Sequence, residues 1–286
     1  MPILDPILAQ LLRVVPHHAV SRLTHRVARW ESPRMQPLLR WFIRHYRLDM
    51  SEAAESEPVA YPSFNKLFTR ALRADARPLQ GDEFSIVSPA DSRISALGTI
   101  ETGQIFQAKG HTYTVTELLG GFADLARPFA RGSFLTVYLS PRDYHRLHMP
   151  IAGRLTTMVH VPGRLFSVAP RIVAHTPRLY ARNERVIAFF ETAIGPVAMA
   201  LIGAINVGSI ETVWAGEITP PSRRHIRRID YGNQEIRLDR GAEMGRFNLG
   251  SSVVLLLPEH PLHFDPALAP EKFIRFRQEV ARIARV

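Results

Sequence analysis

The sequence contains no cysteine, which excludes disulfide bonds, thiolate metal sites, a cysteine nucleophile and palmitoylation. Lysine is also scarce: only Lys66, Lys109 and Lys272 are lysines among the 36 basic residues, which leaves 33 arginines. No uninterrupted apolar run of about 18 residues occurs, so we expect no transmembrane helix. Charged and polar residues between Asp5 and Arg13 interrupt the first apolar stretch, and no basic segment precedes it. We therefore expect no signal peptide, and a protein that stays in the compartment where it is made.

The 286 residues are 46% apolar and 22% charged, values typical of a soluble globular protein, and their formal net charge is +10. So basic a chain is expected to bind anionic partners, either nucleic acid or an acidic membrane surface. The run from Arg223 to Arg228 is the best nucleic-acid candidate. It lacks interleaved aromatic residues and any helix-turn-helix, RNP or zinc-finger pattern. We interpret it as a solvated face or a phosphate-facing loop, and predict no nucleic-acid partner.

Residues 1–48 are predicted to be helical, because apolar residues recur at helical spacing in three successive stretches. These residues are Ile3, Leu4, Ile7, Leu8, Leu11 and Leu12, then Val20, Leu23, Val27 and Trp30, then Leu38, Leu39, Phe42, Ile43 and Tyr46. Residues 1–47 hold eight arginines against two acidic residues, a net charge of +6. Apolar stripes with tryptophan and arginine are typical of helices that lie on an anionic bilayer. The pattern fits an ordinary bundle packed on the protein's own core equally well.

Residues 49–62 are acidic and rich in turn formers, and are predicted to be a linker. Ser63 is predicted to cap a short helix that runs to Leu72. Beyond it, short β-type runs separated by glycine and proline predict strands. These runs are Ile86–Val87, Ile94–Leu97, Ser133–Leu139, Arg154–Val161, Val186–Glu191, Val197–Ala204 and Val253–Leu257. The predicted fold class is α+β: amphipathic N-terminal helices followed by a β-rich domain of sandwich or barrel type over residues 63–286.

Three further features of the second domain are predicted. Residues 116–125 are expected to form a helix, and residues 270–286 a final helix with Phe273, Phe276, Val280 and Ile283 on one side. The turn-like segments 88–94 and 149–155 resemble each other, which would suit a barrel with internal two-fold symmetry.

The stretch from Asn248 to Ser252 precedes the apolar run 253–257 and has two interpretations. A Gly-Ser pair before such a run is first of all a turn that enters a buried strand. The alternative is that the Gly250–Ser251 bond cleaves itself: the serine hydroxyl attacks the glycine carbonyl, and the new N-terminal residue becomes a carbonyl cofactor. Gly250 has no side chain, so its carbonyl can be approached closely.

Asp91, His145, His148 and Ser251 are the residues that could carry chemistry. Aspartate, histidine and serine can act as orienting group, base and nucleophile, although any chain of this length contains such a set. The His-x-x-His spacing of His145 and His148 lacks a third ligand, so we predict no metal site. No Gly-x-Ser-x-Gly motif surrounds Ser251, which argues against an ordinary α/β hydrolase.

Eight segments together identify a family resemblance: 64–68, 88–91, 107–111, 138–150, 166–168, 181–185, 207–216 and 243–252. Over them, and so over most of the chain, the sequence resembles the bacterial phosphatidylserine decarboxylases, membrane enzymes that depend on a pyruvoyl group. The resemblance implies autocatalytic cleavage between Gly250 and Ser251 into a β chain (1–250) and an α chain (251–286). It also implies that His148, oriented by Asp91, removes the Ser251 hydroxyl proton. Residue 251 would then become the pyruvoyl group with loss of ammonia.

The same resemblance implies how turnover would proceed. The amine of phosphatidylserine would form a Schiff base with the pyruvoyl ketone, carbon dioxide would leave, and hydrolysis would release phosphatidylethanolamine. His145 is the candidate for the group that acts in decarboxylation or reprotonates the product. No metal and no pyridoxal phosphate are expected, since none of the three lysines stands in a recognisable pyridoxal-binding pattern. A peripheral homodimer on the cytoplasmic face of the bacterial inner membrane is implied, with residues 1–48 facing an anionic membrane.

Two positions depart from the family pattern: Ser252 stands where the family usually has threonine, and Ser92 where it often has glycine. The first keeps a hydroxyl, so processing should survive, while the second restricts the backbone conformations open to the turn that holds Asp91. Three other functions remain open from the residues alone. They are a serine hydrolase using Asp91, His148 and Ser251, a basic nucleic-acid-binding protein, and a related decarboxylase of a soluble amino acid.

Overall fold

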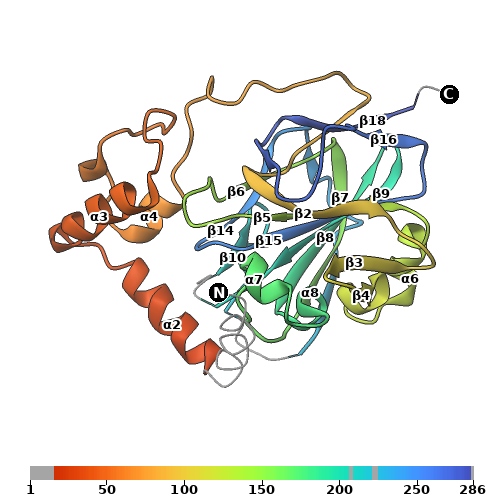
Figure 1. Ribbon diagram of the computed structural model, residues 1–286, viewed down its shortest axis with the longest axis horizontal. Helices are drawn as coiled ribbons and strands as arrows, with labels where there is room; N and C mark the ends of the chain where they lie inside the picture. The colour runs from red at the N-terminus through yellow and green to blue at the C-terminus, as the bar shows by residue number, and fades with distance from the viewer. Residues whose placement is uncertain (1–15, 206–208, 221–224, 285–286) are drawn as a thin grey trace.

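The computed structural model describes residues 16–205, 209–220 and 225–284 (Figure 1). The predicted apolar stripe at residues 3–12 lies outside these ranges. Helices α2, α3 and α4 lie on one side of a β-rich body (Figure 1). Multiple antiparallel sheets with a few helices confirm the predicted α+β class. Among the described residues, no helix is long and apolar enough to cross a membrane.

The helices are short, and their starts follow local sequence signals. Ser63 accepts a hydrogen bond from the amide of Lys66, which confirms the predicted N-cap of α4. Thr114 and Glu117 form a capping box at the start of α5. The single helix predicted over 116–125 is instead two shorter helices, α5 and α6. The helical elements are α2 (His17–Ala28), η1 (Pro33–Met35), α3 (Gln36–Tyr46), η2 (Pro58–Ala60), α4 (Phe64–Phe68), α5 (Val115–Leu118), α6 (Ala123–Ala126), η3 (Arg127–Phe129), α7 (Pro170–Val173) and α8 (Leu179–Arg182).

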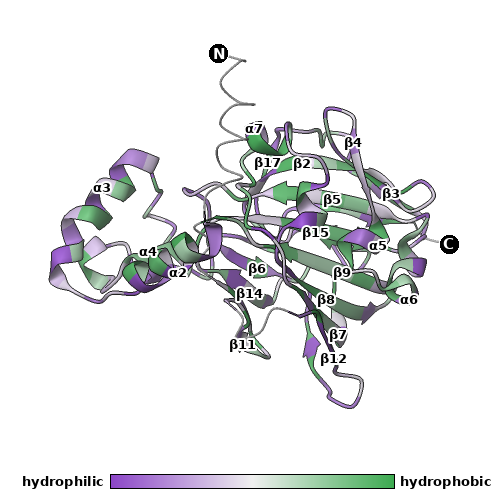
Figure 2. Cartoon of the chain, turned by 90° about the horizontal axis from the view of Figure 1, so that it is seen from below, coloured by the Kyte–Doolittle hydropathy of each residue, from purple (hydrophilic) through white to green (hydrophobic). Residues whose placement is uncertain are grey.

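A nine-stranded antiparallel sheet forms the centre of the body, in the order β12-β7-β8-β9-β15-β5-β2-β17, with β13 also paired to β7. Its strands are β2 (Ser92–Thr99), β5 (Ser133–Tyr138), β7 (Gly153–Val161), β8 (Arg185–Thr192), β9 (Gly195–Ile202), β12 (Arg227–Asp230), β13 (Arg237–Leu238), β15 (Ser252–Leu257) and β17 (Phe273–Ile274). Strand β15 lies between β9 and β5 and is buried along its whole length. Figure 2 shows hydrophobic residues along β8 and β9. A continuous apolar run is typical of a central strand buried on both faces. Each run predicted as a strand overlaps an observed strand, although the runs to Leu139 and Ala204 extend past the ends of β5 and β9.

Three smaller sheets complete the body. One is β1-β18-β16, formed by β1 (Ser85–Val87), β18 (Glu279–Ile283) and β16 (Leu262–Phe264). A second is β11-β10-β14-β6, formed by β11 (Gly216–Glu217), β10 (Ile210–Thr212), β14 (Glu243–Phe247) and β6 (Arg146–His148). The third is the hairpin of β3 (Gln104–Ala108) and β4 (His111–Thr114).

The C-terminal segment corrects one prediction, because residues 270–286 do not form a helix where they are described. Glu271 and Arg277 have φ values of 69° and 67°, in the left-handed region that a continuous right-handed helix excludes. Strand β18 instead pairs with both β1 and β16. Pairing with segments distant in the sequence therefore overrides the local helical spacing.

The two similar turns lie against each other. The amide of Val87 donates to the carbonyl of Pro150, and the amide of His148 donates to the carbonyl of Pro89, both at 2.9 Å. These reciprocal bonds join the segment that holds Asp91 to the segment that holds His148.

The described residues have two hydrophobic cores. The larger fills the β-rich body. The smaller, here called the helical cluster, consists of Ala28, Leu39, Phe42, Leu48, Tyr61, Leu67, Phe68 and Leu249. Because it includes residues 61, 67 and 68, it crosses the boundaries predicted at 48 and 62, and those boundaries stay a prediction. Leu249, just before the predicted cleavage bond, belongs to the helical cluster, whereas β15 after that bond belongs to the larger core.

Candidate active site

The Gly250–Ser251 bond joins a loop to the buried strand β15. The Leu139 amide donates to the carbonyl of Ser251 at 2.8 Å, and the Asn248 amide donates to that of Ser209 at 3.0 Å. This arrangement confirms that a turn enters a buried strand here. Ser251 is fully buried, and within the described ranges its hydroxyl oxygen has no hydrogen-bond partner. A buried hydroxyl without a partner is costly, so this atom is a candidate for a reactive role.

His145 contacts the residue before this serine. A Cβ placed on Gly250 would lie 3.1 Å from His145 Nε2 and 3.2 Å from the Leu139 carbonyl oxygen, so a larger residue would be crowded here. Nδ1 of His145 donates to the carbonyl of Asp143 at 2.8 Å, which leaves the lone pair on Nε2. Nε2 has no partner in the part of the chain that the structure describes. Burial, helped by the charge of Arg70, lowers the pKa of His145 to about 3, so its ring is neutral at pH 7.

His148 is held by different groups. Its Nδ1 donates to the carbonyl of Gly241 at 3.0 Å, and its Nε2 lies 3.2 Å from the hydroxyl of Tyr144, which donates to it. The Phe276 ring stacks on the imidazole with a centroid distance of 4.1 Å and an interplanar angle of 19°. Burial lowers the pKa of His148 to about 4, so this ring is also neutral with its lone pair on Nε2.

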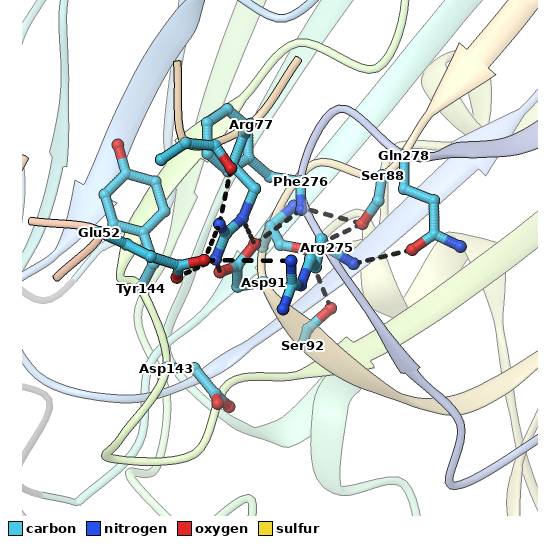
Figure 3. A network of polar contacts seen from close by, with 12 residues as sticks. Glu52, Arg77, Ser88, Asp91, Ser92, Asp143, Tyr144, Arg275, Phe276 and Gln278 are labelled. Carbon is cyan, nitrogen blue, oxygen red and sulfur yellow. Dashed lines mark hydrogen bonds and ion pairs between the residues drawn. The ribbon is translucent and has the colours of Figure 1, made fainter. Parts of the chain in front are cut away.

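Asp91 lies in a buried ion network (Figure 3). Its carboxylate accepts hydrogen bonds from Arg77 at 2.6 and 3.2 Å and from the amide of Phe276 at 2.8 Å. Arg77 also donates to both carboxylate oxygens of Glu52, at 2.7 and 2.8 Å. No hydrogen bond between Asp91 and His148 is present among the described residues. Asp91 instead accepts a hydrogen bond from the Phe276 amide, and the Phe276 ring stacks on His148, so the orientation of His148 by Asp91 stays a prediction.

Asp143 lies outside this network, as Figure 3 shows. Its carboxylate accepts hydrogen bonds from the amide and hydroxyl of Ser140, both at 2.7 Å. Burial raises the pKa of Asp143, and these bonds offset part of that rise. Asp143 therefore shapes the turn whose carbonyl fixes the His145 ring.

A cavity of about 420 Å³ that is lined mainly by aromatic and aliphatic residues reaches Gly250. Its wall includes aromatic side chains from α3, α4 and β5: Phe42, Tyr46, Phe64, Phe68 and Tyr138. The Phe68 ring also lies 4.0 Å from the ring of His145, centroid to centroid. The helices thus form one wall of the approach to the Gly250–Ser251 bond.

The structure brings His145 to Gly250 and places His148 with Asp91 on the two reciprocally bonded turns. Sequence reasoning missed four residues that hold Asp91 and His148 in place: Arg77, Glu52, Phe276 and Gly241. Among 33 arginines no spacing distinguishes Arg77, so only the fold could have identified it.

Burial of two neutral histidines predicts a pH-dependent stability. Their folded-state pKa values of about 3 and about 4 lie below the ordinary value of about 6.5. Below pH 6.5 the unfolded chain takes up protons that the folded chain does not, so the free energy of unfolding falls as pH falls toward 4. The slope is at most about 1.4 kcal/mol per pH unit for each histidine. Denaturant unfolding of the Ser251→Ala chain between pH 7 and 5 measures it.

The double substitution His145→Asn and His148→Asn should flatten this pH dependence, whereas His263→Asn, at an exposed position, should not. An equally steep curve in the double variant would contradict the assignment.

A family model described as "Phosphatidylserine decarboxylase" matches residues 64–282, and a second, described as "PSD", matches residues 7–47. Proteins named phosphatidylserine decarboxylase proenzyme are 56% identical over 263 residues in Alkalilimnicola ehrlichii (90% of each chain) and 50% identical over 285 residues in Shewanella loihica (98% of this chain, 100% of the relative). One from Bordetella pertussis is 53% identical over 260 residues, covering 90% of this chain and 87% of the relative. The chain belongs to the phosphatidylserine decarboxylase family.

Proposed function

We propose that this chain decarboxylates phosphatidylserine to phosphatidylethanolamine, using a pyruvoyl group that it generates at residue 251 by cleaving the Gly250–Ser251 bond. Family membership and the name proenzyme among its relatives support the proposal. The observation that carries it is the fully buried Ser251 hydroxyl, which lacks a partner among the described residues and follows a glycine in contact with His145. The Ser252 hydroxyl is also buried without a partner among the described residues, so the position of Ser251 directly after Gly250 is what distinguishes it.

The cleavage step uses the Ser251 hydroxyl as nucleophile. Its oxygen attacks the Gly250 carbonyl carbon, its proton passes to a neutral histidine, and the peptide becomes an ester. Elimination and hydrolysis, with release of ammonia, leave the carbonyl at residue 251. Both histidines carry their lone pair on Nε2 and can accept the proton. We assign this role to His148, as the family resemblance implies.

A pyruvoyl group fits the residues at this position. A pyruvoyl group has fewer non-hydrogen atoms than the serine residue it replaces. It therefore needs no additional space at residue 251, which β15 and its neighbouring strands enclose. Its carbonyl supplies the electron sink for loss of carbon dioxide. We assign reprotonation of the product to His145. Its Nε2, without a partner among the described residues and close to residue 250, would first take up a proton from the ammonium group of the substrate and then donate it to the product carbon. Burial also favours loss of a charged carboxylate.

The substrate is a membrane lipid, and the helices present features suited to it. Leu23, Val27, Trp30, Leu38 and Trp41 are exposed large apolar residues on or beside α2 and α3. The same helices contribute to the cavity that reaches Gly250. Figure 2 shows α3 carrying both hydrophilic and hydrophobic residues. We propose that these helices dock on an anionic membrane surface. One side of the helices packs in the helical cluster, and the opposite side would contact lipid. The homodimer and the cytoplasmic inner-membrane location stay predictions.

Self-cleavage is tested by Ser251→Ala. Removal of the attacking hydroxyl should leave one uncleaved and inactive chain on a denaturing gel. Ser133→Ala, at the far end of the β5–β15 pairing, should cleave and turn over normally. A Ser251→Ala chain that is still cleaved, or a wild-type chain that stays whole, is active and is labelled by a fluorophosphonate, would contradict the proposal and favour a serine hydrolase.

The same gel separates the two histidines. We expect His148→Ala to remain uncleaved, and His145→Ala to cleave but release carbon dioxide at least a hundredfold more slowly, a typical loss for one acid–base group. Because His145 is the ring that contacts Gly250, the opposite pattern would exchange the two roles.

Membrane docking is tested at described positions, since Leu8, Leu11 and Leu12 lie outside them. The triple substitution Leu23→Glu, Trp30→Glu and Trp41→Glu should reduce co-sedimentation with phosphatidylglycerol-containing vesicles severalfold, because charged groups enter the bilayer interface poorly. Activity on detergent-dispersed phosphatidylserine should persist. Phe106→Glu, at an exposed residue of β3 on the other side of the body (Figure 1), is the matched control. Equal sedimentation of both variants and the wild type would refute the assignment.

A further inference from the structure

Arg70 is a buried cation whose donors are largely unused. It follows α4, and only 5% of its surface is exposed. Its Nη2 lies 3.4 Å from the carbonyl of Arg142, while Nε and Nη1 have no partner within the described part of the chain. Burial lowers the pKa of Arg70, yet a guanidinium remains charged at neutral pH. A buried charge without a counterion is destabilising, so such donors indicate a site for an anion.

The carboxylates around Arg70 are occupied by other groups. Asp91 is paired with Arg77, and Asp143 accepts its short hydrogen bonds from Ser140. The neighbouring arginines are also neutralised: Arg29 pairs with Glu217, Arg146 with Glu243, and Arg246 with Glu211. Arg70 is different, because no ion pair of its own is present among the described residues.

The position of Arg70 relates it to the reaction centre. It lines a cavity of about 630 Å³ beside Lys66, Arg146 and Asn248, and a second of about 420 Å³ beside Arg142 and Tyr144. The α4 segment therefore presents polar and cationic groups to these cavities. Its aromatic residues Phe64 and Phe68 line the cavity at Gly250.

Two contacts connect this segment to the cleavage site. Phe68 lies against His145, and the Asn65 side-chain amide donates to the backbone carbonyl of Asn248 at 3.2 Å and to its side-chain oxygen at 3.0 Å. An amphiphilic molecule that entered along α4 would meet an apolar wall and a buried cation close to residue 250.

We propose that Arg70 binds an anionic oxygen group of the substrate head group, either its phosphate or its carboxylate; this rests on the proposed function. Both groups offer two oxygens that match the guanidinium fork, and the buried setting strengthens the interaction. Arg70 is then a substrate-binding residue that selects an acidic phospholipid. The phosphate is the better match chemically, because a carboxylate held by a buried guanidinium would resist leaving as carbon dioxide.

The test is the kinetics of Arg70→Gln on phosphatidylserine in detergent micelles. We expect KM to rise at least tenfold while kcat changes less than threefold, since a binding contact common to ground and transition state is lost. Arg70→Lys, which keeps the charge but loses the fork, should show a smaller rise. Arg73→Gln removes the same charge from an exposed ion pair with Asp75 three residues away, and should leave both constants unchanged.

Inhibition by phosphatidylethanolamine separates the two head-group anions, because this lipid keeps the phosphate and lacks the carboxylate. An inhibition constant that rises together with KM assigns Arg70 to the phosphate. An unchanged inhibition constant with a raised KM assigns it to the carboxylate.

The inference is overturned if KM in both Arg70 variants equals that of Arg73→Gln. It is also overturned if Arg70→Gln stays uncleaved or melts early while Arg70→Lys cleaves and has the wild-type KM, which would make Arg70 structural. Failure of the proposed function gives a different result: wild type and Arg73→Gln would then release no carbon dioxide from phosphatidylserine.

Discussion

The segment from Leu249 to Val253 passes directly from one hydrophobic core of the described residues to the other. Leu249 packs in the helical cluster, while Ser252 to Leu257 form the central strand of the large sheet. Gly250 and Ser251 therefore lie between the helical cluster and the sheet. In the proposed cleavage, loss of either core would free one of the two groups relative to the other. Proximity of this kind can contribute several kcal/mol to an intramolecular reaction.

The polar groups around the bond follow from the same burial. Two histidines kept neutral by desolvation, with Nδ1 bonded to backbone carbonyls, present unprotonated nitrogens. The charged residues are separated from them: Asp91, Arg77 and Glu52 satisfy one another, and Phe276 donates to Asp91 through its amide and stacks on His148 through its ring. Neutral bases beside a compensated ion network permit acid–base chemistry in a dry interior without a stranded carboxylate.

Some elements of the fold could be predicted from the sequence, and others could not. Strands β5, β7, β8, β9 and β15 followed from apolar and β-branched runs, because burial on both faces leaves a continuous hydrophobic signal. The end of the chain could not be predicted this way, since 273, 276, 280 and 283 also fit a helix; its structure depends on pairing with β1, about 200 residues earlier.

The residues of the site also fall into two groups, those identified from the sequence and those identified only from the fold. Residue identities at 91, 145, 148 and 251 came from resemblance, yet the partners Arg77, Gly241 and Phe276 came only from the fold. Arg70 gave no signal among 33 arginines, because what distinguishes it is burial and the lack of a paired acid among the described residues. Local sequence encodes strands and caps, whereas charge compensation is decided by contacts between distant segments.

The central claim is that the Gly250–Ser251 bond is cleaved and that residue 251 becomes a carbonyl cofactor. The intact mass of the purified protein tests it most directly. Two chains should be found, one ending at residue 250 and one spanning residues 251–286, the second lighter by one ammonia than its encoded peptide. A single chain of full encoded mass with phosphatidylserine decarboxylase activity would contradict the claim. So would two chains whose smaller member retains an ordinary N-terminal serine while the preparation is active.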